Sequence, residues 1–204
     1  MANVFTRDLN DPMDEVQQKI KDKMIEVTKL ELTDKASYHA YEEVYPFLLD
    51  KFIGKKCNML EVGMSWGGGM QILSELFPDS NIYGVDFSLS MLNLIPNNIY
   101  QTVELIDLNE PLKYDDNDFD AIICVGTFTY GHVKAHALDE FIRVTNKNGY
   151  ICFTINEGIY TEYKFDKKIN ELSQNKSLEV LNLSKSSYIV NKDVEAWLCL
   201  VKKN

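Results

Sequence analysis

The chain has little positive charge and few cysteines. Its 204 residues carry 21 Lys and Arg against 31 Asp and Glu, which gives a formal net charge of −10. Broad binding to a phosphate backbone needs a basic patch, so we expect no nucleic-acid partner. The four cysteines lie in apolar, strand-like runs without the spacing of metal ligands. This pattern favours buried, reduced thiols in a cytoplasmic protein.

Long apolar runs are also absent. No stretch approaches the roughly 20 residues that a membrane span requires, and the first residues lack the pattern of a signal peptide. We therefore expect no membrane partner. The composition, 45% hydrophobic and 25% charged, is typical of a globular protein, and the length suits one domain with a sizeable core.

The segment from Cys57 to Met70 is the most informative part of the sequence. Asn58–Val62 is predicted to be a short buried strand, and glycines follow it before apolar residues recur at helical spacing. A strand, a glycine turn and a helix N-terminus together bring main-chain N–H groups close to a ligand. The next predicted strand, Asn81–Asp86, ends in an acid that can hold a ribose diol. These parts indicate a nucleotide-like cofactor.

Glu61 distinguishes between cofactors. As a dinucleotide fingerprint the turn is imperfect, because Ser65 stands at the second glycine position. Nicotinamide-binding folds normally carry an apolar residue two positions before the first glycine, which is Gly63 here. An acid at that point can bind a cationic or amine-bearing ligand, either directly or through water.

Two motifs carry a family resemblance. Glu61-Val-Gly63-Met-Ser65-Trp-Gly67, followed by Gly84-Val-Asp-Phe-Ser88, resembles the first two motifs of class I S-adenosylmethionine (SAM)-dependent methyltransferases. The likeness extends over residues 32–155 and implies SAM as the cofactor. It implies that the glycine turn holds the methionine part, Asp86 the ribose hydroxyls and Asp107 the adenine amino group. The implied cofactor-binding residues are Glu61, Gly63, Ser65, Gly67, Asp86, Phe87, Asp107, Leu108 and Val125.

Two narrower resemblances suggest different acceptors. Residues 119–154 are similar to methyltransferase-like proteins of the Williams–Beuren region, whereas residues 32–42 and 77–86 are similar to macrolide-type sugar O-methyltransferases. The sugar enzymes carry a paired-aspartate metal motif after the fourth strand. Because this chain has Cys-Val-Gly-Thr at 124–127 instead, we expect no metal site.

The order of apolar segments predicts an α/β fold. Strands are expected at 58–62, 81–86, 99–106, 119–125, 150–155, 178–190 and 194–201, with helices at 133–144 and 162–172. Such alternation implies a parallel sheet with helices on both faces and ligands at the carboxyl ends of the strands. The resemblance specifies a doubly wound, Rossmann-like class I methyltransferase sheet that ends in an antiparallel hairpin.

Residues 1–55 precede this SAM-binding domain, which we expect to cover residues 56–204. Apolar stripes predict one amphipathic helix from Met13 to Val27 and another from Tyr41 to Phe52, ending at Gly54. We expect these helices to form an N-terminal cap, either as a lid over the cofactor or as a further packing layer, with both parts in one structural unit.

Histidines are the first candidates for a general base. Methyl transfer from a sulfonium is an in-line displacement, to which alignment alone can contribute much of the acceleration. An oxygen acceptor also benefits from a base with a pKa near neutrality. His39 lies in the N-terminal segment and His132 follows the fourth strand, so both are candidate catalytic residues. His136 is expected to be exposed on a helix.

Aromatic residues in the same segments are candidates for the walls of an acceptor pocket. Tyr38, Tyr41, Phe128 and Tyr130 can surround a sulfonium by cation–π attraction, or they can pack in the core. The resulting hypothesis is methyl transfer from SAM to a small-molecule substrate at a hydroxyl, with a sugar as one option. Two alternatives remain: a SAM-binding regulatory protein without turnover, and a nicotinamide-dependent oxidoreductase.

Overall fold

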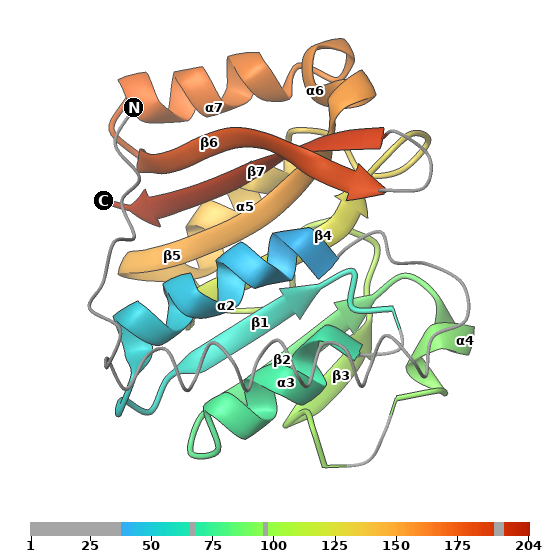
Figure 1. The fold of residues 1–204 in the computed structure, drawn as a ribbon, viewed down its shortest axis with the longest axis vertical. Coiled ribbons are helices and arrows are strands. Elements are labelled where there is room, and N and C mark those ends of the chain that lie inside the picture. The colour runs from blue at the N-terminus through green and yellow to red at the C-terminus, as the bar shows by residue number, and fades with distance from the viewer. Residues whose placement is uncertain (1–37, 66–67, 96–97, 190–193) are drawn as a thin grey trace.

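The structure is a computed structural model that describes residues 38–65, 68–95, 98–189 and 194–204. The described part contains a seven-stranded sheet in the order β3-β2-β1-β4-β5-β7-β6, shown in Figure 1. The strands are β1 (Asn58–Val62), β2 (Asn81–Asp86), β3 (Thr102–Leu105), β4 (Phe119–Phe128), β5 (Thr145–Asn156), β6 (Leu178–Ile189) and β7 (Val194–Lys203). The helices are α2 (Tyr38–Phe52), α3 (Gly68–Leu76), α4 (Leu89–Leu92), α5 (Ala137–Val144), α6 (Glu157–Glu162) and α7 (Phe165–Gln174).

The strand direction alternates at the edge of the sheet formed by β5, β7 and β6. Strands β3, β2, β1, β4 and β5 pair in parallel, whereas β7 is antiparallel to both β5 and β6. This arrangement confirms the predicted doubly wound sheet with a terminal antiparallel hairpin. Because β1 pairs with β2 on one side and with β4 on the other, the chain winds outward from β1 in both directions. Ligands of open α/β sheets bind at the carboxyl edge beside such a switch point.

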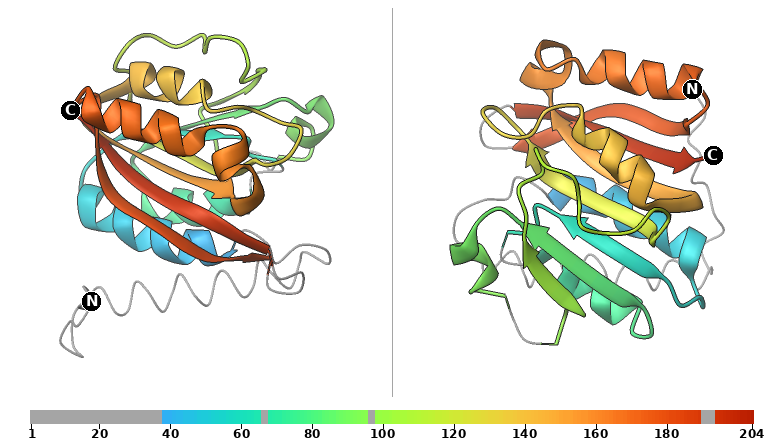
Figure 2. Two further views of the ribbon diagram at one scale, coloured as in Figure 1. Left: turned by 90° about the horizontal axis from the view of Figure 1, so that it is seen from above. Right: turned by 180° about the vertical axis from the view of Figure 1, so that it is seen from behind.

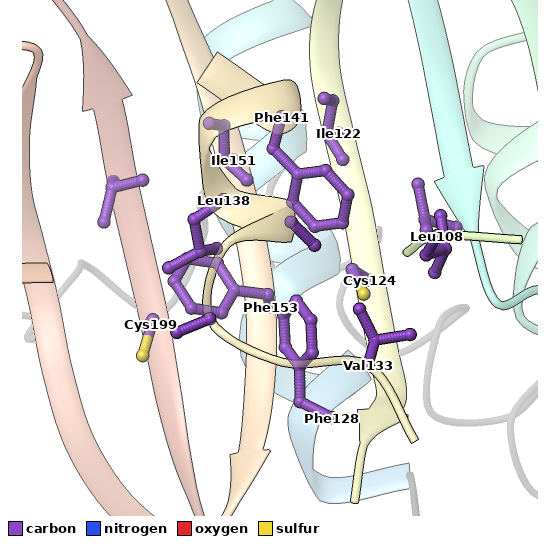
Figure 3. Packing of buried hydrophobic residues seen from close by; sticks show 14 of the residues in the cluster. Leu108, Ile122, Cys124, Phe128, Val133, Leu138, Phe141, Ile151, Phe153 and Cys199 are labelled. Atoms are coloured by element: carbon purple, nitrogen blue, oxygen red, sulfur yellow. The ribbon is translucent and has the colours of Figure 1, made fainter. Parts of the chain in front are cut away.

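Helices cover both faces of the sheet. In Figure 2, α2 lies on one face, and α5 and α7 lie on the other. One apolar core joins α2 and α3 to residues such as Met59 and Ile123. A second core joins α5, α6 and α7 to the opposite face. Figure 3 shows part of this second core, where Phe128, Phe141 and Phe153 lie close together.

The N-terminal cap is only partly described. The predicted helix from Met13 to Val27 lies outside the described residues. The second predicted helix is α2, and Gly54 follows it with a positive φ of 70°, as expected for a glycine after a helix end. Along α2, Val44, Tyr45 and Leu48 are buried against the sheet. Helix α2 is therefore a packing layer of the sheet, and a domain boundary at residue 55 stays a prediction.

Several element boundaries differ from the predicted ones. Strand β3 begins at Thr102 rather than at residue 99, because the ladder with β2 starts where Thr102 pairs with Tyr83. Helix α5 begins only at Ala137, after a tight turn in which the Ala137 N–H donates to the carbonyl of Lys134. The predicted helix at 162–172 corresponds to α7, which starts only at Phe165 because Lys164 adopts a left-handed conformation with φ 64°. The short helix α6 before it was not predicted.

The four cysteines have the burial that the sequence predicts. Cys57, Cys124, Cys152 and Cys199 are all free and buried. Each helix in the described part of the chain is too short or too polar to span a bilayer.

Candidate functional site

The turn after β1 is built around a glycine that no other residue can replace without strain. Gly63 has a φ of +69°, and a Cβ added there would lie 1.9 Å from Thr127 Oγ1. The Thr127 hydroxyl donates to the carbonyl of Val62 at 3.2 Å, while the Gly63 N–H donates to the carbonyl of Val85 at 2.9 Å. The turn is thus held between the ends of β2 and β4. Its backbone can approach a ligand closely because Gly63 has no side chain.

Asp86, at the end of β2, links this turn to the next loop. Its Oδ2 accepts a hydrogen bond from the main-chain N–H of Ser65 at 2.8 Å, and its Oδ1 accepts one from Ser88 N–H at 2.7 Å. Ser65 itself has a positive φ of 52°. A carboxylate has about four lone-pair sites, so Asp86 can accept two further hydrogen bonds. A ribose diol fits this remaining capacity.

Glu61 lies in β1 with only 2% of its surface exposed. Along β1, Met59 belongs to the core under α2, so Glu61 points to the same face. Its Oε1 accepts from the Tyr41 hydroxyl at 3.3 Å and its Oε2 from the Tyr100 hydroxyl at 2.5 Å. Tyr100 precedes β3, and no sequence pattern indicated it as a site residue.

Burial dominates the electrostatics of Glu61. It raises the pKa of this carboxyl to about 8, and the negative charge of Asp86 acts in the same direction. The hydrogen bonds from Tyr100 and Tyr41 oppose this shift. No Lys or Arg among the described residues forms an ion pair with Glu61. A ligand that carries an amine can supply the missing positive charge.

The predicted adenine residues lie next to Asp86. The Ile106 N–H donates to the carbonyl of Asp86, so the chain after β3 runs beside the end of β2. The side chain of Asp107 is exposed, and its Oδ1 accepts from the N–H and the side-chain amide of Asn109, both at 2.9 Å. Phe87 is 74% exposed, which leaves its ring free to stack on a base.

Two of the predicted cofactor residues are buried in the cores instead. Leu108 packs in the core under α5, and Val125 in the core under α2. Their side chains are therefore part of the packing, and only their main-chain groups are suited to contact a ligand. Gly67 and the neighbouring Trp66 lie outside the described residues.

The loops after β4 and β5 carry the residues that were predicted to face an acceptor. The Gly131 N–H donates to the Tyr163 hydroxyl at 3.1 Å, and Tyr130 contacts the same ring edge-on with centroids 6.2 Å apart. Gly158 leaves room for Tyr130, since a Cβ there would lie 2.3 Å from the Tyr130 hydroxyl. Asn156 caps α6 by accepting from Gly158 N–H at 3.0 Å. These contacts bring the two loops together at the carboxyl edge.

The candidate bases have different positions. His132 is exposed in the loop after β4, and its main-chain N–H donates to the carbonyl of Thr129. His136 is exposed directly before α5. His39 lies in the first turn of α2, and its side chain is outside what the structure describes. The structure thus leaves the choice between His39 and His132 open.

The predicted aromatic pocket does not form as a unit. Phe128 is buried among Phe141, Phe153 and Phe165, so the core alternative applies to this residue. Tyr41 is buried against Glu61, whereas Tyr130 is exposed in the acceptor loop. The side chain of Tyr38 is not among those described.

Comparison with known proteins shows similarity to methyltransferases. Residues 60–153 match the model of a family described as a methyltransferase domain. Human methyltransferase-like protein 27 is 36% identical over 75 residues, which cover 36% of this chain and 30% of the human protein. The match therefore spans about a third of that relative.

Solved structures show the same fold over most of the chain. A putative S-adenosyl-L-methionine-dependent methyltransferase from Methanococcus maripaludis has a TM-score of 0.62 at 14% identity, with 98% of each chain covered. A SAM-dependent methyltransferase from Aquifex aeolicus has a TM-score of 0.58 at 17% identity, covering 87% of this chain and 97% of its own. The [4+2]-cyclase SpnF also has a TM-score of 0.62, at 13% identity, covering 93% of this chain and 94% of its own. The fold therefore also supports other chemistry.

Proposed function

We propose that this chain carries a class I SAM-dependent methyltransferase domain and that it transfers the methyl group of SAM to a hydroxyl oxygen of a small molecule. The observation that carries the proposal is the group of residues beside β1. A buried carboxyl that forms no ion pair with a Lys or Arg of the described segments, a positive-φ glycine turn and a strand-end aspartate lie at one switch point. Each of them fits one part of SAM.

Different residues of the site correspond to different parts of the cofactor. In this proposal Glu61 binds the ammonium of the methionine part, and the turn at Gly63 and Ser65 allows close approach of main-chain groups. Asp86 binds the ribose hydroxyls, and the exposed ring of Phe87 stacks on the adenine. SAM, once bound, supplies an electrophilic methyl group on a sulfonium. A nicotinamide dinucleotide offers no ammonium for the buried acid.

The acceptor side suits a hydroxyl-bearing molecule. The loops after β4 and β5 carry hydrogen-bonding groups such as Thr129, Tyr130 and Asn156, together with His132. Among these residues His132 is suited to take the proton from an acceptor hydroxyl, and His39 is its competitor on α2. The rest of the rate enhancement comes from holding the acceptor in line with the sulfonium. We propose a neutral or cationic polyol-like acceptor, with sugars included.

A transfer assay tests this function. Purified protein is incubated with SAM that carries a trideuterated methyl group and with panels of small alcohols, sugars, amines and carboxylic acids. Mass spectrometry then identifies any product that has gained the labelled methyl group. Labelling confined to hydroxyl compounds supports the proposal, and labelling of amines alone would overturn the acceptor class. Cofactor binding without any labelled product would favour the regulatory alternative.

A further inference from the structure

Two tyrosines from separate segments of the chain converge on Glu61. Tyr41 comes from α2 and Tyr100 from the segment before β3, and each hydroxyl donates to a different oxygen of the carboxyl group. The three residues are far apart in sequence, 20 and 39 positions from Glu61. Because Glu61 is almost fully buried, both hydrogen bonds form away from bulk water, where they are stronger than on the surface.

Glycines stand where the two tyrosines need space. A Cβ on Gly69 would lie 2.5 Å from the Tyr41 hydroxyl. A Cβ on Gly84 would meet the side chain of Met64 first, and it would also lie 2.9 Å from Cδ1 of Tyr100. Side chains essentially never approach so closely. Gly84 lies inside β2, where a glycine otherwise weakens a strand. Gly69 therefore leaves room for Tyr41, and Gly84 leaves room for both Met64 and Tyr100.

Helix α2 also holds the start of α3. The Tyr45 hydroxyl donates to the carbonyl of Gly69, and the rings of Tyr41 and Tyr45 stack with centroids 4.9 Å apart. One face of α2 thus contacts both Glu61 and the first turn of the helix that follows the glycine loop. A shift of α2 would therefore affect both Glu61 and the first turn of α3.

Among the described residues, the titratable groups that interact with Glu61 carry no positive charge. They are Tyr41 of α2, Tyr100, Asp86 of β2 and Cys124 of β4. Burial raises the pKa of the Glu61 carboxyl to about 8. At neutral pH the carboxyl is therefore mostly protonated, and a bound ammonium favours its ionised form.

We propose that Tyr41 and Tyr100 are positioning residues for the cofactor, which hold the Glu61 carboxyl in place to pair with the ammonium of the methionine part. The inference rests on the proposed function. Binding then ionises Glu61, and its proton passes to the buffer. The tyrosine hydroxyls favour the ionised form by donating to it, so they lower the pH at which the cofactor binds well.

Calorimetry with S-adenosylhomocysteine tests the proposal. The ligand is titrated between pH 6.5 and 8.5 in two buffers of different ionisation enthalpy, which gives both affinity and protons released. For the unaltered protein we expect affinity to rise toward pH 8, with about half a proton released at pH 8. In Tyr41→Phe and Tyr100→Phe, we expect the pH at which the affinity increases to be higher by about one pH unit. We also expect these variants to release a larger fraction of a proton per ligand bound at pH 8. The affinity of these variants should be roughly tenfold lower than that of the unaltered protein at pH 7, and the difference should be smaller at pH 8.5.

Tyr114→Phe is the matched control. The Tyr114 hydroxyl donates to Glu104 at 3.1 Å, so this variant also loses a tyrosine-to-carboxylate hydrogen bond, but on the other face of the sheet. We expect it to keep the affinity and proton release of the unaltered protein. Glu61→Gln should bind without releasing this proton. Circular dichroism checks that each variant is folded, and Tyr41→Phe alone tests the proposal if Tyr100→Phe does not fold.

The outcomes distinguish a failure of the proposed function from a failure of the positioning role of Tyr41 and Tyr100. No binding by the unaltered protein would overturn the proposed function. The positioning role alone would be overturned if the unaltered protein binds, the loss of affinity in the Tyr41 and Tyr100 variants is the same at every pH, and their proton release is unchanged.

Discussion

The main-chain N–H of Ser65 donates to Oδ2 of Asp86 at 2.8 Å, which ties the turn after β1 to the end of β2. The hydrogen bond links the two parts of the site that are expected to hold the methionine and ribose of one cofactor. Ser65 adopts a left-handed conformation with φ 52°, so the turn needs this fixed acceptor to stay in place.

Replacement of Asp86 by Ala should weaken S-adenosylhomocysteine binding by about 1–3 kcal/mol. The variant loses the proposed ribose contact and leaves the Ser65 N–H without its acceptor. Calorimetry measures the change, with Asp79→Ala as the control because Asp79 is exposed in the turn before β2. Unchanged affinity in a folded Asp86→Ala protein would remove Asp86 from the site.

Glu61 should make the protein less stable as the pH rises. Its pKa is raised from 4.5 to about 8 in the folded state, so the folded state binds this proton more tightly than the unfolded state. The contribution to stability is complete below about pH 4.5 and is lost as the pH rises through about 8, by up to about 1.4 kcal/mol per pH unit. Urea unfolding at pH 5, 6.5 and 8 measures this slope.

The variant Glu61→Gln isolates the effect, because its side chain does not titrate. We expect a flatter dependence of its unfolding free energy on pH between 5 and 8. Glu140 does not interfere in this window, because its pKa is lowered by the hydrogen bond from Arg143. An equal slope in both proteins would show that Glu61 is not protonated in the folded state.

Gly63→Ala should destabilise the protein more than Gly54→Ala does. Both glycines have a positive φ, +69° and +70°, so both variants carry the backbone cost of about 1–2 kcal/mol. Only at Gly63 does a Cβ also meet Thr127, since nothing lies within 4 Å of a Cβ at Gly54. We expect a further loss of at least about 1 kcal/mol in Gly63→Ala. Equal denaturation midpoints would mean that the turn can move away from Thr127.

His132→Asn should reduce turnover by about 10²–10⁴-fold if His132 is the general base, with little change in cofactor affinity. His136→Asn is the control, because His136 is exposed beside the same loop. The same measurement on His39→Asn decides between the two candidates. If both variants keep full turnover, catalysis depends on alignment alone.

Strand bounds were predicted well for the buried apolar runs that lead to the glycine turn and to Asp86. β1 and β2 have the predicted bounds, because both have a neighbouring strand on each side and several buried residues. β3 is shorter than predicted because Tyr100 is apolar enough to extend the pattern, yet it turns away to contact Glu61. Local periodicity does not distinguish a residue in a ladder from one that leaves it for a distant partner.

The site was predictable only in part. Glu61 and Asp86 were identified from their places in the motifs, and the structure brings both to the carboxyl edge beside the glycine turn. Tyr100 was missed and Tyr41 was expected in an acceptor pocket. Their roles depend on contacts between residues far apart in the sequence, which no spacing encodes.

The most direct test is a calorimetric titration of the unaltered protein with S-adenosylhomocysteine and, separately, with a nicotinamide dinucleotide, both without added metal. A buried acid, a glycine turn and a strand-end aspartate predict one binding site for S-adenosylhomocysteine and much weaker or undetectable dinucleotide binding. Preferential binding of the dinucleotide, or no binding of S-adenosylhomocysteine by the folded protein, would contradict the assignment.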